Sequence, residues 1–174
     1  SRTSVLEHYG LRTLLYGTLL PGPDIGRREA ALMRRVRDGG HEVGIHCWDH
    51  IRWQDYVAGK DAAWTRREMQ RAAQRFAEIF GEPARTHGAA GWQMNAAAYA
   101  CERELGFDYA SDGRGTHPFL PIGDDGAPCG VPQLPTTLPT LDELIGLDGL
   151  DAGNVDQHLL ALTAAAGPGQ VYTL

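Results

Sequence analysis

The segment from Gly40 to His50 reads Gly-His-Glu-Val-Gly-Ile-His-Cys-Trp-Asp-His, and it decides how the rest of the sequence is interpreted. Val43, Ile45 and Cys47 alternate with Glu42, Gly44 and His46. Such a period of two predicts a β-strand with one buried face. Gly39 and Gly40 precede it and are typical of a helix end, because glycine accepts the left-handed cap geometry.

Two histidines, His46 and His50, lie four residues apart where this predicted strand ends. If the chain turns helically after Ile45, both imidazole rings project to one side and can bind the same ion. Sites in α/β proteins gather at the C-terminal ends of strands, which favours this hypothesis. The alternative is two polar residues at a strand end, because the spacing alone occurs often by chance.

Short strands alternate with helices along the chain, which indicates an α/β architecture with a mainly parallel sheet or barrel. The expected helices are 27–37, one that begins at a capping box of Thr65 and Glu68 and ends at Gly81, one between Asn95 and Gly106, and two that begin at Thr140 and Asn154. The expected strands are 42–48, 84–87, 107–111, 131–134 and 170–174.

Composition narrows the class of protein. The 174 residues, 43% of them hydrophobic, suffice for one domain with a buried core. A formal net charge of −6 argues against nucleic-acid binding, which relies on clustered Lys and Arg. Three cysteines without a C-x-x-C pair indicate a reducing, cytoplasmic environment. Residues 1–20 carry leucines at helical spacing, which predicts a helix whose apolar face packs in a core or faces lipid.

The segment Gly40–His50 resembles the metal-binding motif of the polysaccharide deacetylase (NodB-like) superfamily, in the form found in deformylases of formamido-arabinose on undecaprenyl phosphate. The resemblance continues in order and spacing through 20–26, 88–93, 109–115 and 135–143. It implies part of a distorted (β/α) barrel and one divalent metal ion (zinc, manganese, cobalt or nickel) on His46 and His50. It also implies water attack on a formamide, which releases formate and a free amine.

The same resemblance implies a lipid-linked sugar substrate, a place at the cytoplasmic face of the bacterial inner membrane with peripheral contact, and a role in lipid A modification that opposes cationic peptides. Two other functions stay open. One is N-deacetylation of another carbohydrate, since the sequence does not reveal the acyl pocket. The other is a non-catalytic member or a binding module on the same scaffold. The simplest alternative is an α/β domain that binds no metal.

Several further residues are candidates for the site. Asp112 and Arg114 match the family's S-D-x-R-G segment and are candidates for catalysis and substrate binding, or else a surface pair beside a glycine turn. Trp92 is a candidate substrate-binding residue whose ring would form an apolar wall beside the sugar or lipid, although large aromatic residues more often lie in cores. His87 stands where many members have an arginine, and it either contacts substrate or completes a strand.

Two motifs of the family have no match in this sequence. Members carry an aspartate motif on their first strand, for a metal ligand and the base, and a histidine on the last strand, for the acid. We therefore expect 1–174 to be one incomplete deacetylase-like domain, with 1–20 a helical segment and 24–174 a barrel portion that lacks its first and last strand regions. We expect it to be inactive alone and to belong to a longer protein.

Overall fold

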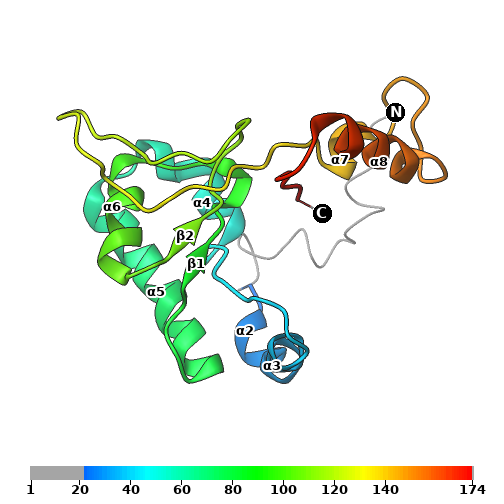
Figure 1. Cartoon of the computed structure of the whole chain (residues 1–174). Coiled ribbons are helices and arrows are strands. Elements are labelled where there is room, and N and C mark those ends of the chain that lie inside the picture. Colours follow the sequence, from blue (N-terminus) through cyan, green and yellow to red (C-terminus); the bar gives the residue numbers. More distant parts are fainter. Residues whose placement is uncertain (1–21, 174) are drawn as a thin grey trace.

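The computed structural model describes residues 22–173 (Figure 1), so the helix expected within 1–20 lies outside the described residues. The helices are α2 (Ile25–Arg28), α3 (Ala30–Asp38), α4 (His50–Tyr56), α5 (Ala62–Phe80), α6 (Ala96–Leu105), α7 (Leu141–Leu144) and α8 (Val155–Ala166). Two 3-10 turns, η1 (Val57–Gly59) and η2 (Ala90–Trp92), and two strands, β1 (Thr86–His87) and β2 (Tyr109–Ala110), complete the order.

The strands form the parallel arrangement that the alternation of elements predicts. In β1 and β2, Thr86 lies opposite Tyr109 and His87 opposite Ala110. Single parallel bridges continue this arrangement on both sides, from Ile45 to His87 and from Ala110 to Gln133. Four parallel segments, which contain Ile45, His87, Ala110 and Gln133, therefore lie side by side. Their C-terminal ends meet at one edge of this arrangement.

All five expected strands are shorter than predicted or absent. β1 and β2 cover two residues each of the expected 84–87 and 107–111, and the segment 131–134 forms only single bridges at Gln133. The segment 42–48 is reduced to the bridge at Ile45, because within the described part of the chain its backbone bonds only to residues 86 and 88. Residues 170–173 form no strand; the Val171 carbonyl accepts instead from the backbone N–H groups of Thr137 and Leu138. Leu174 lies outside the described residues.

Helix ends follow the local sequence with two exceptions. The helix expected at 27–37 is interrupted at Glu29, so that α2 and α3 are separate helices. Gly81 and Gly106 end α5 and α6 at φ values of 76° and 74°, and the Asn95 side chain caps α6, all as predicted. The capping box expected at Thr65 is wrong, because α5 begins earlier, where the Asp61 side chain accepts from the Trp64 N–H at 2.7 Å. A good cap one turn upstream makes Thr65 an interior helix residue.

The core lies between the strands and the long helix α5, which also contacts α2, α3 and α6. Trp53, Val57 and Met69 are at most 2% exposed and bring α4, η1 and α5 together. In Figure 1, α7 and α8 lie on the far side of the strands from α5 and α6. Within residues 22–173, no helix is long and apolar enough to cross a bilayer.

Gly44 allows the segment that carries His46 to lie close to β1. A Cβ at this position would lie 2.5 Å from the Thr86 side chain and 2.8 Å from the Thr86 carbonyl oxygen. We expect Gly44→Ala to lower the free energy of unfolding by about 1–3 kcal/mol, the usual cost of overpacking. Gly59→Ala is the control, since a Cβ there meets nothing within 4 Å. Equal stability of the two variants in urea denaturation would show that this close contact is not required.

Candidate metal centre

The structure brings His46 and His50 together. His46 follows the bridged Ile45, and His50 is the first residue of α4, because the Asp49 side chain caps that helix by accepting from the Arg52 N–H at 3.0 Å. The turn between them requires a positive φ of 54° at Cys47. The two ring centroids lie 5.1 Å apart with 52° between the ring planes.

This geometry fits two ligands of one ion. Two imidazoles that bind a tetrahedral ion through nitrogens about 2.1 Å from it have centroids roughly 5 Å apart. The Nδ1 atom of His46 lies 2.7 Å from the Gly88 carbonyl oxygen. A carbonyl only accepts, so Nδ1 donates and Nε2 stays unprotonated, as metal binding requires. Neighbouring groups displace water from this otherwise exposed ring, and this desolvation lowers the pKa of His46 and favours its neutral form.

Both rings face a cavity of about 580 Å³ that is also lined by Gln54, Trp92, Ser111 and Asp142. The Trp92 indole donates to the Thr136 hydroxyl at 3.2 Å, and its backbone has a φ of 55°. Strained conformations of this kind persist where the surroundings fix them, often at functional sites. Trp48 lines a second cavity of about 890 Å³, which His46 also lines, and Arg71 stacks on the Trp48 ring at 4.4 Å.

Arg114 packs against the ring of Trp92. Its guanidinium lies 4.9 Å from the Trp92 ring centroid and donates to both carboxylate oxygens of Glu143 at 2.8 Å. A further hydrogen bond at 3.2 Å joins it to the Leu138 carbonyl. The charge of Arg114 is therefore paired within the protein, and the residue holds a wall of the cavity without lining it.

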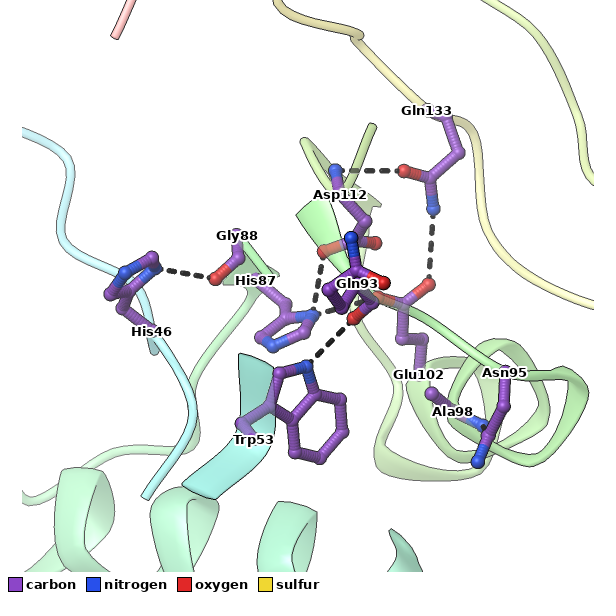
Figure 2. A network of polar contacts seen from close by, with 10 residues as sticks. All are labelled: His46, Trp53, His87, Gly88, Gln93, Asn95, Ala98, Glu102, Asp112 and Gln133. Carbon is purple, nitrogen blue, oxygen red and sulfur yellow. Dashed lines mark hydrogen bonds and ion pairs between the residues drawn. The ribbon is translucent and has the colours of Figure 1, made fainter. Parts of the chain in front are cut away.

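His87 and Asp112 lie in the interior, where two residues that the sequence did not single out join them. We call His87, Glu102, Asp112 and Gln133 the buried cluster; each is at most 2% exposed. Glu102 Oε1 lies 3.0 Å from His87 Nδ1, and Gln133 Nε2 donates to Glu102 Oε2 at 3.1 Å (Figure 2). The Gln133 side-chain oxygen accepts from the Asp112 backbone N–H at 3.2 Å.

The two carboxylates converge on one ring nitrogen. Asp112 Oδ1 lies 2.8 Å from His87 Nδ1 but outside hydrogen-bond geometry, because that N–H points to Glu102. Within residues 22–173, His87 Nε2 and both Asp112 carboxylate oxygens have no hydrogen-bond partner. Neither His87 nor Asp112 lines the cavity beside His46, so neither is placed to touch a substrate there.

Burial and proximity set the charges of the buried cluster. Desolvation raises the pKa of Glu102 to about 8, which favours its protonated form. Desolvation opposes protonation of His87, but the adjacent carboxyl groups of Asp112 and Glu102 outweigh it and raise its pKa to about 9. Desolvation also opposes ionisation of Asp112, yet the adjacent His87 holds its pKa below the usual range. These shifts favour a protonated His87 beside an ionised Asp112.

Ligand atoms of His87, Glu102 and Asp112 lie within 4.8 Å of one another, a grouping that can also hold a metal ion. We interpret it as a proton-sharing cluster. Its three side chains are fully buried and line neither cavity. His46 and His50, in contrast, are exposed and face a cavity.

The raised pKa values predict how stability depends on pH. A group whose pKa is higher in the folded protein stabilises it fully below the unfolded value and loses this effect as pH rises through the folded value. For Glu102 this window runs from 4.5 to about 8, and for His87 from 6.5 to about 9. We expect the free energy of unfolding in urea to fall by at least about 1 kcal/mol, the equivalent of one pKa unit, between pH 5 and 9.

Glu102→Gln should remove the loss of stability that comes from Glu102, between pH 4.5 and about 8, and leave the loss that comes from His87. Wild-type stability that is flat or rises across the same range would contradict these charge assignments.

Comparisons with known proteins agree with the fold and identify the family. The family model for polysaccharide deacetylase matches residues 4–110. The chain is 36% identical over 174 residues to a protein of Shewanella sediminis described as a probable 4-deoxy-4-formamido-L-arabinose-phosphoundecaprenol deformylase, covering 99% of this chain and 55% of that protein. A protein of Wigglesworthia glossinidia brevipalpis with the same description is 30% identical, covering 84% of this chain and 51% of its own. The chain thus spans about half the length of these relatives.

Solved structures show the same fold at low identity. A probable polysaccharide deacetylase of Pseudomonas aeruginosa superposes with a TM-score of 0.63 at 23% identity, over 81% of this chain and 46% of that one. Puue allantoinase gives a TM-score of 0.60 at 24% identity, over 81% and 47%. The expected architecture, part of a deacetylase-type barrel, is thereby confirmed. With the family model matching more than half of its residues, the chain belongs to the polysaccharide deacetylase family.

Proposed function

We propose that this protein is a metal-dependent hydrolase that removes the formyl group from an amino-arabinose carried on undecaprenyl phosphate. The observation that carries the proposal is the 36% identity, along 99% of the chain, to the deformylase of Shewanella sediminis. The paired rings of His46 and His50 beside a cavity supply a site suited to that chemistry.

His46 and His50 are the proposed metal ligands. Imidazole suits zinc, cobalt, nickel and manganese, and the family generally uses a divalent ion. When bound, such an ion polarises an amide carbonyl and acidifies water. The Gly88 carbonyl holds the His46 ring in one orientation and one tautomer, so that Nε2 faces the cavity without a proton.

The cavity wall is the proposed seat of the sugar. Trp92 offers an amphipathic ring fixed by Thr136 and Arg114, and Asp142 offers a carboxylate that can accept hydrogen bonds from hydroxyl groups. Arg114 and His87 were expected to touch substrate; we instead propose that Arg114 acts through Trp92 and that His87 acts from the interior. Asp112 is likewise proposed to act from the interior.

The remaining parts of the site are proposed to come from sequence beyond this chain. A catalytic zinc site uses three protein ligands and an open position, and the relatives are about twice as long. Within residues 22–173, the one group of three or more clustered metal-ligating side chains is the buried cluster. A lipid-linked substrate would place the protein at the inner membrane, and we propose its cytoplasmic face.

Formate release from a formamido-arabinose phosphoprenol tests this function in the full-length protein. We expect His46→Ala and His50→Ala to lower kcat/KM and zinc affinity by more than about 100-fold, since even outer residues of a metal site are worth 10- to 100-fold. His158→Ala, an exposed histidine in α8, is the matched control and should leave both unchanged.

The same assay with the acetamido analogue separates the alternatives. Faster release of acetate than of formate would favour N-deacetylation of another carbohydrate. Stoichiometric zinc without release of either acid would favour a non-catalytic member of the family, and wild-type protein that retains no metal would refute the hydrolase proposal.

A further inference from the structure

Gln54 lies one helical turn after His50 on α4, and both residues line the cavity of about 580 Å³. Residues four positions apart lie on the same face of a helix, and helical side chains lean toward the N-terminus of their helix. The side chain of Gln54 therefore leans toward His50. Its amide group lies on the side of the cavity where the proposed metal centre is.

A buried hydrogen bond holds this part of α4 against the cavity wall. The Trp53 indole is 2% exposed and donates to the Gln93 carbonyl at 2.8 Å (Figure 2). Gln93 follows η2 directly, and η2 contributes Gly91 and Trp92 to the cavity wall. Because Gln54 is the residue after Trp53, its backbone is fixed relative to that wall.

The backbone of Gly91 leaves room for the Gln54 side chain. A Cβ at Gly91 would lie 2.6 Å from Gln54 Cγ, 2.7 Å from Cδ and 2.9 Å from Oε1, and each distance is too short for a real contact. Gly91 also has a φ of 59°, which favours glycine. The Gln54 side chain thus packs directly on the backbone of the cavity wall, which restricts its movement on that side.

The amide of Gln54 is free to bind a ligand. The residue is exposed, and its side chain forms no hydrogen bond with any other part of 22–173. Other polar side chains of the cavity wall have partners within the protein: Trp92 bonds to Thr136, Ser111 to the Leu134 carbonyl, Thr140 to Asp142, and Thr173 to Thr136. Gln54 therefore offers two N–H donors and one carbonyl acceptor to the cavity.

A sugar hydroxyl matches these groups, because it also both donates and accepts hydrogen bonds. The formamido-arabinose in the description of the Shewanella sediminis relative carries a hydroxyl on the ring carbon next to its formamide. The covalent structure of the sugar keeps this hydroxyl close to the amide that is hydrolysed. A side chain that leans toward His50 is therefore well placed to bind it.

We propose that Gln54 is a specificity-determining residue that binds the sugar hydroxyl next to the formamide. It selects amides whose neighbouring ring carbon carries a hydroxyl group, and it takes no part in metal binding or proton transfer. This inference rests on the proposed function for the identity of the sugar.

Sugar binding tests the proposal in the full-length protein with its metal. The probes are the methyl glycoside of 4-amino-4-deoxy-L-arabinose, which resembles the product and is not hydrolysed, and the same compound without the hydroxyl next to the amine. We expect the wild type to bind the first probe roughly 3- to 10-fold more tightly, the value of one hydrogen bond. Gln54→Leu should bind both probes with equal affinity and should keep the zinc affinity of the wild type.

Gln74→Leu is the matched control, because it makes the same chemical change on α5. Gln74 is exposed, bonds to Glu78 at 3.2 Å and lines neither cavity. This variant should distinguish the two probes as the wild type does. Formate release from the lipid-linked substrate should fall roughly 3- to 10-fold in kcat/KM for Gln54→Leu and stay unchanged for Gln74→Leu.

Gln54→Leu protein that still prefers the first probe as strongly as the wild type overturns the proposal, and so does wild-type protein that binds both probes equally or binds neither. Wild-type protein that distinguishes the probes through Gln54 but releases no formate would count against the proposed function alone.

Discussion

Two backbone hydrogen bonds hold the site together, from the Ile45 N–H to the Thr86 carbonyl at 3.1 Å and from the Gly88 N–H to the Ile45 carbonyl at 3.0 Å. They set the register between the segment that carries His46 and the one that carries His87. In this register His46 lies beside the Gly88 carbonyl, and the next helical turn brings His50 to the same side. A shift by one residue would turn His46 to the opposite face, and Gly44 permits the close approach that the register requires.

Around this register the protein separates two kinds of histidine. His46 and His50 face a cavity, and desolvation lowers the pKa of His46. His87 lies between two carboxylates in the interior and favours its charged form. The same residue type is thus proposed as a metal ligand in one place and favours the charged form in the other. The neighbouring groups account for this difference.

Local signals in the sequence predicted much of the fold. The caps at Gly81, Asn95 and Gly106 depend on nearby residues, and they were predicted correctly. Thr65 misled because its capping box competes with Asp61 one turn earlier. The strand at 42–48 was overestimated, since alternation reports which side chains are buried and not how many backbone partners the segment has.

The site was predicted only in part for a similar reason. The spacing of His46 and His50 revealed a pair, and the structure places their rings side by side. His87 and Asp112 were expected to act directly at the site, but both are buried. No local sequence pattern reports this burial. Glu102 did leave a signal, a carboxylate on the apolar stripe of a helix with Ala98 and Cys101, but its partners come from segments 15 and 31 residues away in sequence.

The central claim is that one divalent ion binds between His46 and His50. A crystal structure of the zinc-loaded full-length protein, with anomalous scattering recorded at the zinc edge, tests it most directly. We expect one strong peak about 2.1 Å from Nε2 of His46 and from a ring nitrogen of His50. A peak among His87, Glu102 and Asp112 instead, or no peak that both exposed rings share, would contradict it.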